Sequence, residues 1–206
     1  MELKNIFTAL VANYSADQSL IDELWREIEK SYSHKKRYYH NLTHLERLIE
    51  QLQEYKNLIA DWDTILFSVF YHDIVYKVLL KDNEERSANL AVNRLGQIGF
   101  PPQKVIVCSQ QILATKAHTI SNNPDTNLFT DADLSVPGLA QPEYATYCQQ
   151  IRKEYSIYPD IVYNPGRKKV LNHFLQMDRI FKTPAFADKY EAQARANLSW
   201  ELERLS

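Results

Sequence analysis

Apolar residues recur at helical spacing along this chain, and this pattern constrains its fold more than any other feature. One run places five large apolar side chains at positions i, i+3, i+4, i+7 and i+11: Ile21, Leu24, Trp25, Ile28 and Tyr32. No stretch alternates polar and apolar residues over the length of a strand, and the chain has only 4 glycines in 206 residues. We therefore expect an all-α protein.

Capping residues, prolines and turn sequences predict where the helices begin and end. Thr43 and Glu46 have the spacing of a capping box, so Thr43 is the expected N-cap. Asp61 or Asp63 is the expected cap of the next helix, and Asn164-Pro165-Gly166 predicts a turn. Later helices are expected at about 84–96, 102–112, 142–155, 168–181 and 188–205.

Length, charge and composition describe an ordinary globular chain. Residues 1–206 fit one domain, and no linker is rich enough in glycine, proline or serine to mark a boundary. A net charge of −2 gives no reason to expect specific nucleic-acid binding, and no apolar run approaches the length of a membrane span. The N-terminal residues lack the pattern of a signal peptide, and Cys108 and Cys148 lie in helical patterns. We expect a cytoplasmic protein with free thiols.

Four separated segments add nitrogen and oxygen ligands to this apolar helical pattern. They are residues 39–44, 72–73, 114–118 and 131–135. Together they offer imidazoles and carboxylates, which suit a divalent metal that holds and activates water.

His72 and Asp73 follow a very apolar helix, so both side chains are expected to start from a buried position. A buried carboxylate is costly unless a cation or hydrogen-bond donors stabilise it. The pair therefore fits a metal site, although a His–Asp hydrogen bond closing the helix fits equally well.

His40 and His44 lie on either side of the expected helix start. His44 falls in the first turn, where a rigid element would fix it as a ligand should be fixed. His40 falls in the preceding loop, where it has the freedom expected of a proton donor. The alternative is two exposed histidines in a basic loop that also contains Lys35 and Lys36.

Asp131 and Asp133 are two residues apart, which on a helix points their side chains about 200° apart. Only one of them is expected to face a metal, and the spacing does not say which. A pair of helix caps is the alternative. His118 could be a ligand, a substrate contact or an exposed turn residue.

The order His, His-Asp, Asp resembles the HD-domain superfamily of metal-dependent phosphohydrolases. Tyr39-His40-Asn41-x-x-His44 and Ala132-Asp133-Leu134-Ser135 look like motifs of the class I cyclic-nucleotide phosphodiesterases, which share that helical fold. A closer likeness is to small predicted HD-domain phosphohydrolases, and it extends over nearly the whole chain.

The resemblance implies a helical bundle of HD-domain type and a role for each site residue. It makes four residues the metal ligands: His44, His72, Asp73 and Asp133. His40 would protonate the leaving oxygen, and Asp73 could also bridge two metals or take the proton of the attacking water. The choice of Asp133 over Asp131 rests on this resemblance. The chain is too short for a phosphodiesterase catalytic domain, so cyclic-nucleotide hydrolysis is not implied.

The function expected from these observations is hydrolysis of a small phosphate ester, with nucleotides among the candidates. Mixed His/Asp ligation does not choose between manganese, magnesium, iron, cobalt, nickel and zinc. Two alternatives remain: an HD-fold di-iron oxygenase, and a non-catalytic metal-binding or regulatory module.

Cationic residues are candidates for binding a substrate phosphate. Arg37 and Lys77 lie near the motifs in the sequence, and the resemblance adds three C-terminal residues, Arg152, Arg167 and Arg195. His118 is a further candidate for substrate contact. Glu84 and Glu85 could hydrogen-bond a ligand histidine or a coordinated water. The alternative for each cation is a solvated face or a structural ion pair, and for the two glutamates it is pairing along their own helix.

Overall fold

A computed structural model describes residues 2–205, and this part of the chain is helical without a strand. The expected all-α class is thereby confirmed. The residues divide into two compact units, an N-terminal unit (Met1–Thr130) and a C-terminal unit (Asp131–Ser206). The single domain expected over residues 1–206 stays a prediction, because one domain can contain two such units.

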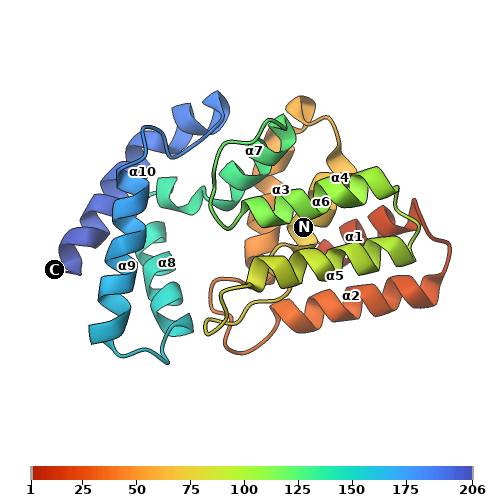
Figure 1. Cartoon of the computed structure of the whole chain (residues 1–206), viewed down its shortest axis with the longest axis horizontal. Coiled ribbons are helices and arrows are strands. Elements are labelled where there is room, and N and C mark those ends of the chain that lie inside the picture. Colours follow the sequence, from red (N-terminus) through yellow and green to blue (C-terminus); the bar gives the residue numbers. More distant parts are fainter. Residues whose placement is uncertain (1, 206) are drawn as a thin grey trace. The chain divides into compact units, whose positions relative to one another are not determined.

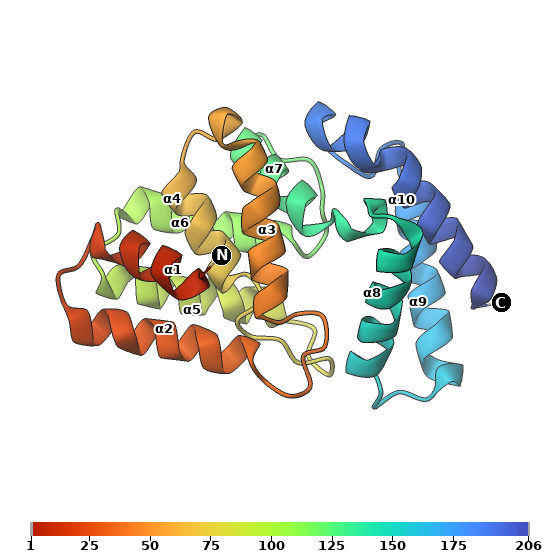
Figure 2. The same ribbon diagram turned by 180° about the vertical axis from the view of Figure 1, so that it is seen from behind.

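Six α-helices and a short 3-10 helix form the N-terminal unit, and a seventh α-helix runs from this unit into the C-terminal one (Figures 1 and 2). They are α1 (Leu3–Ala12), α2 (Gln18–Tyr32), α3 (Leu42–Glu54), η1 (Lys56–Leu58), α4 (Trp62–Tyr71), α5 (Asn83–Gln97), α6 (Pro102–Ala114) and α7 (Pro124–Asp133).

Helix α4 is the centre of the N-terminal unit. Its residues from Thr64 to Tyr71 are all buried, and it contacts α3, α5 and α6. A helix that is apolar on every side must be covered on every side, which explains this position. Phe7 of α1 packs edge-on against Phe70 at a ring distance of 5.0 Å, so α1 joins the same core. The sequence analysis did not anticipate α1.

The helix starts in this unit agree with the expected capping chemistry at two places and differ at a third. Asp61 caps α4 by accepting from the Thr64 amide, and Pro102 is the first residue of α6. The expected Thr43 cap is wrong, because Asn41 is the N-cap of α3. The Asn41 side chain accepts from the amides of Thr43 and His44, so these two amides are already satisfied.

The C-terminal unit contains three long helices and a short 3-10 helix. They are η2 (Val136–Gly138), α8 (Gln141–Glu154), α9 (Asp160–Leu175) and α10 (Pro184–Arg204). The segment η2 packs closely on α10. A Cβ on Gly138 would overlap the Cβ of Tyr190, and the Asn197 amide donates to the carbonyls of Pro137 and Leu139.

The expected turn at 164–166 is wrong, because Pro165 lies inside α9. A proline costs a helix one backbone hydrogen bond, but it does not end a helix that packing stabilises. Tyr163 and Leu171 are buried on either side of this position. Arg167 donates two hydrogen bonds to Glu201 of α10, at 2.8 and 2.9 Å. These contacts extend α9 back to residue 160.

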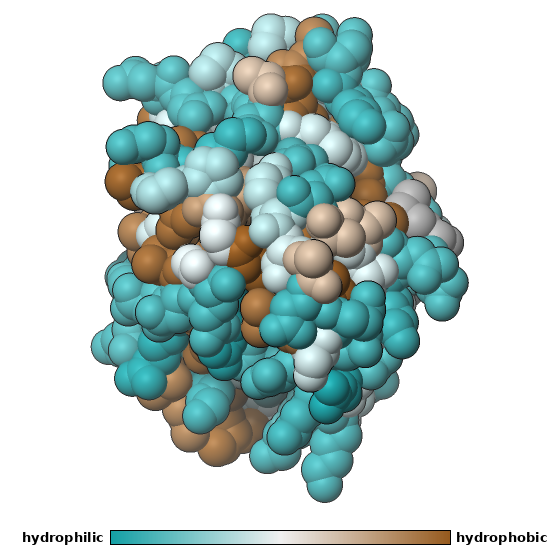
Figure 3. All heavy atoms as spheres, turned by 90° about the vertical axis from the view of Figure 1, so that its right-hand side faces the viewer, coloured by the Kyte–Doolittle hydropathy of each residue, from teal (hydrophilic) through white to brown (hydrophobic). Residues whose placement is uncertain are grey.

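Polar side chains dominate the face drawn in Figure 3, with apolar atoms interspersed among them. Among residues 2–205, we find no helix with the length and apolar character needed to cross a membrane. Many large apolar side chains fill the cores of the two units. Among the fully buried ones are Tyr32, Phe67, Phe70, Tyr71, Phe129, Tyr144, Phe181 and Phe186.

Candidate metal centre

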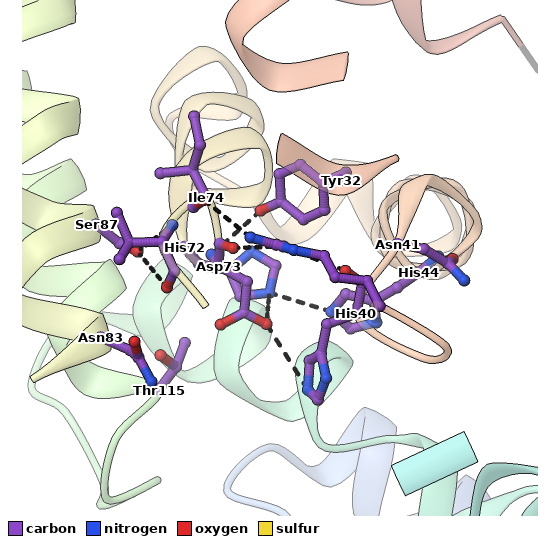
Figure 4. Close-up of polar contacts among 12 residues, drawn as sticks. Tyr32, His40, Asn41, His44, His72, Asp73, Ile74, Asn83, Ser87 and Thr115 are labelled. Carbon is purple, nitrogen blue, oxygen red and sulfur yellow. Dashed lines mark hydrogen bonds and ion pairs between the residues drawn. The ribbon is translucent and has the colours of Figure 1, made fainter. Parts of the chain in front are cut away.

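His72 is the C-cap of α4, and one hydrogen bond determines which of its ring nitrogens can bind a cation. Figure 4 shows its ring beside His44 and Asp73. Its side chain is 1% exposed, and Nδ1 lies 2.8 Å from the carbonyl oxygen of Val69. Because a carbonyl can only accept, Nδ1 must carry the proton. In the neutral ring, Nε2 is then the nitrogen without a proton, which is the form a metal requires.

His44 lies in the first turn of α3 and is buried, with its Nε2 3.1 Å from Nε2 of His72. In the metal-free protein one of these nitrogens must donate a proton to the other. With a cation between them, both could offer lone pairs. Two ligands about 2.1 Å from a metal and at right angles are about 3 Å apart, so the observed separation fits neighbouring positions in one coordination sphere.

Asp73 brings a carboxylate to the same place. Its Oδ2 lies 3.2 Å from Nε2 of His72 and 3.9 Å from Nε2 of His40, and its side chain is 18% exposed. Burial by itself would raise the pKa of this carboxyl, but without a metal a protonated His72, through its charge and hydrogen bond, together with His40 and His44, holds the pKa well below its usual range. Asp73 is therefore an anion facing three imidazoles.

His40 lies in the turn before α3, as expected, and its role as a proton donor stays a prediction. Its ring stacks on Tyr76, with centroids 4.1 Å apart and planes 29° apart, and its side chain is 18% exposed. Tyr39 contacts the rings of both His40 and His44, at 4.9 and 5.0 Å. His40 and Asp73 are thus more accessible than the deeply buried His44 and His72.

Arg37 was expected to bind a substrate phosphate, and the structure gives its guanidinium other partners. The group donates to the carbonyl oxygens of His40, Asp73 and Ile74. Phosphate contact by Arg37 stays a prediction, and these three bonds indicate a structural role.

Helix α7 contains both candidate aspartates near its end. The ring of Phe129 lies edge-on to His72 at 5.9 Å, and Asp133 follows four residues later, on the same face of α7. Asp131 is fully buried, and its carboxylate accepts hydrogen bonds from Lys182 and Thr183, which precede α10. Asp131 thus has structural partners, and metal ligation by Asp133 stays a prediction. Neither aspartate caps the start of the helix that contains it.

The two glutamates on α5 have a basic partner beyond their own helix. Nζ of Lys116 lies 2.5 Å from Glu85 and 3.9 Å from Glu84. His118 follows in the same connection with φ 49°, in the left-handed region, and its amide donates to Ala114. Contacts of these side chains with a metal or substrate stay predictions.

Lys77 lies in the connection between α4 and α5. Its backbone exchanges two hydrogen bonds with the side chain of Asn83, and its own side chain is exposed. This exposure leaves the ammonium group accessible, so phosphate binding by Lys77 stays a prediction.

Three arginines in the C-terminal unit also have structural partners. Arg152 pairs with Asp160 and donates to two carbonyls in the α8–α9 connection. Arg167 is 11% exposed and pairs with Glu201. Arg195 pairs with Glu191 on its own helix. These contacts agree with the alternative of structural ion pairs, and substrate binding by these arginines stays a prediction.

Three aromatic residues support the centre although sequence reasoning did not assign them to it. The Tyr32 hydroxyl accepts from the Asp73 amide, Tyr76 stacks on His40, and Phe129 contacts His72. Tyr32 was recognised only as part of an apolar helix face. Tyr76 lies in a segment without periodicity, so no sequence signal marked it.

No family model, curated protein or solved structure matches this chain. The likeness to HD-domain phosphohydrolases therefore rests on the sequence motifs.

Proposed function

We propose that this protein is a divalent-metal phosphohydrolase of the HD-domain type. Its metal ligands would be His44, His72, Asp73 and Asp133. The observation that carries the proposal is the convergence on Nε2 of His72, which has a second imidazole nitrogen at 3.1 Å and a carboxylate oxygen at 3.2 Å. The Val69 carbonyl favours the tautomer in which the proton is on Nδ1, so that Nε2 would bind the cation through its lone pair.

The chemistry of the donor set supports a metal with borderline or hard character. Two imidazoles and two carboxylates suit manganese, iron, cobalt, nickel or zinc, and magnesium is compatible with the carboxylates. A metal bound there would polarise a phosphoryl oxygen and lower the pKa of a coordinated water. Asp133 enters as the fourth ligand because of the sequence motif and its place on α7.

The protein side chains would position the substrate and move one proton. His40 is accessible, and Asp73 lies 3.9 Å away, where its charge would stabilise a protonated imidazole. From this position His40 would donate a proton to the leaving oxygen of the ester. Small phosphate esters are the substrate class, with nucleotides among the candidates.

The proposal can be tested on protein purified without a chelating tag. Bound metals are measured, and turnover is assayed in manganese on nucleoside mono-, di- and triphosphates and on an aryl phosphate. We expect one or two equivalents of metal and turnover on at least one ester. Loss of a partner that only orients a metal ligand lowers metal affinity or activity about 10- to 100-fold. Asp73→Asn removes a proposed ligand itself, so it should lower activity about 100-fold or more. Asp133→Asn should behave in the same way.

Asp188→Asn is the matched control, because Asp188 is an exposed carboxylate on α10. It should retain metal and activity. Metal-free protein without turnover would leave a non-catalytic helical module. Tightly bound iron with an optical band and no esterase activity would instead favour the oxygenase alternative.

A further inference from the structure

The guanidinium group of Arg37 connects the two segments that contain the accessible site residues. One terminal nitrogen donates to the carbonyl oxygens of Asp73, at 2.7 Å, and His40, at 3.2 Å. The other donates to the carbonyl oxygen of Ile74 at 2.9 Å. A single side chain thus bonds the turn that holds His40 to the turn that holds Asp73.

Two tyrosine rings hold the guanidinium in this position. Its central carbon lies 4.7 Å from the ring centroid of Tyr32 and 5.6 Å from that of Tyr76. The same two residues also contact the site, because the Tyr32 hydroxyl accepts from the Asp73 amide and the Tyr76 ring stacks on His40. Arg37 is therefore surrounded by groups that fix His40 and Asp73.

The carbonyls of Asp73 and Ile74 follow directly after the C-cap of α4. Carbonyl groups at a helix end carry partial negative charge, so a cation there is favourable. The planar guanidinium group has two separate terminal nitrogens, so it can donate to carbonyls from different segments. A lysine ammonium has its three donors at one point and cannot reproduce that span.

We propose that Arg37 is a positioning residue, which holds His40 and the Asp73 carboxylate in register instead of binding the substrate phosphate. This inference rests on the proposed function for its kinetic consequences. A group that acts only on geometry changes the rate of the chemical step, whereas a group that binds phosphate changes substrate affinity.

Arg37→Lys tests the proposal, because it keeps the charge and removes the two separate terminal nitrogens. With an ester that the wild type hydrolyses, kcat should fall about 10- to 100-fold. KM and the inhibition constant of inorganic phosphate should stay within about twofold of the wild-type values. Arg86→Lys is the matched control, because Arg86 forms an exposed ion pair with Asp82 on the surface of the same unit. Its kcat and KM should not change.

A second measurement does not depend on turnover. The imidazole carbon-bound proton signals of His40 and His72 should shift in Arg37→Lys, while the signal of His173 on α9 and all signals of Arg86→Lys stay unchanged. If wild-type protein hydrolyses no ester, the proposed function fails, and these spectra still decide whether Arg37 positions His40.

Two results would overturn the inference. A rise of about tenfold in KM and in the phosphate inhibition constant, with kcat retained, would make Arg37 a substrate ligand. Unchanged kcat together with unchanged histidine signals would show that the Arg37 guanidinium does not position His40 or Asp73. If Arg37→Lys does not fold, Tyr76→Leu replaces it, since the ring stacks on His40. Tyr76→Leu should also lower kcat and shift the His40 signal, and unchanged values would again contradict the inference.

Discussion

At the scale of single residues, backbone groups decide what the polar side chains of the centre can do. The Val69 carbonyl determines the tautomer of His72, and the Tyr32 hydroxyl holds the amide of Asp73. Asn41 has a similar role for His44, because its side chain accepts from the His44 amide and so fixes the first turn of α3. The candidate ligands are thus positioned by hydrogen bonds from near and distant parts of the sequence.

Asn41→Ala should destabilise the protein more than Thr43→Ala. The Asn41 side chain accepts from two amides at the start of α3 and donates to the Tyr38 carbonyl. Loss of an N-cap lowers the free energy of unfolding by about 1 kcal/mol, and Thr43→Ala should stay within about 0.5 kcal/mol. Urea unfolding followed by circular dichroism measures both. A larger loss of stability in Thr43→Ala than in Asn41→Ala would indicate that Thr43 is the N-cap after all.

The same residues show how far sequence reasoning reaches. It correctly placed His44 in the first turn of a helix and His40 in the loop before it, because a cap followed by an apolar pattern marks a helix start. It chose Thr43 over Asn41 because both residue types can cap. It could not place Tyr76 against His40, because that contact joins two irregular segments, and no periodicity relates them.

At the scale of elements, tertiary packing overrides the local turn sequence within α9 and determines where the C-terminal helices begin and end. The sequence Asn164-Pro165-Gly166 is a strong turn signal, and the helix continues through it because buried contacts lie on both sides. Such contacts are not visible in a local pattern. Helices α5 and α6 were predicted nearly to the residue, because capping chemistry and apolar spacing agree there.

Two glycines in the C-terminal unit should respond in opposite ways to a methyl group. A Cβ on Gly166 meets nothing within 4 Å, so Gly166→Ala should raise the free energy of unfolding by about 0.5–1 kcal/mol. A Cβ on Gly138 overlaps the Tyr190 side chain, so Gly138→Ala should lower it by about 1–3 kcal/mol. Denaturant unfolding of both variants checks this contrast. Equal effects would show that η2 does not pack on α10 as described.

The buried pair of Arg167 and Glu201 should make the stability of α9 and α10 depend on pH. Burial alone would raise the pKa of Glu201, but the hydrogen bonds and charge of Arg167 hold it below its usual range. The ionised carboxylate therefore contributes stability above its unfolded pKa of about 4.3, and this is lost as the pH falls toward the folded pKa. Glu201→Gln should cost about 3–5 kcal/mol at pH 7.

The difference in the free energy of unfolding between wild type and Glu201→Gln should become smaller below about pH 4. Urea unfolding at several pH values gives this dependence. Glu203→Gln is the matched control, because Glu203 is exposed on the same helix. If the loss of stability in Glu201→Gln stays constant down to pH 3, ionisation of Glu201 does not stabilise the fold.

At the scale of the whole molecule, the boundary between the two units falls within α7. The helix begins with residues whose contacts belong to the N-terminal unit. The Asp125 carboxylate accepts from the amides of Ala60 and Asp61, before α4. Its last turn contains Asp131, which binds the segment before α10.

Metal binding should stabilise the whole chain by mass action. Manganese at 100 times its dissociation constant should raise the free energy of unfolding by about 2.7 kcal/mol, and a chelator should remove this gain. His72→Ala should abolish the effect, because it removes the central imidazole of the cluster. His173→Ala, an exposed histidine on α9, is the control and should keep the effect. Thermal unfolding with and without manganese measures it; an equal gain in both variants would contradict the assigned site.

The burial of Asp131 has an evolutionary consequence. Its carboxylate accepts from two amides, a hydroxyl and an ammonium group, and an asparagine could not accept all four bonds. Natural selection should therefore preserve this aspartate as strictly as Asp133, if Asp133 binds metal as proposed. Among descendants of a common ancestor both would look invariant, one for folding and one for chemistry. Homologues that have lost activity should separate them, because they would keep Asp131 while Asp133 is free to drift.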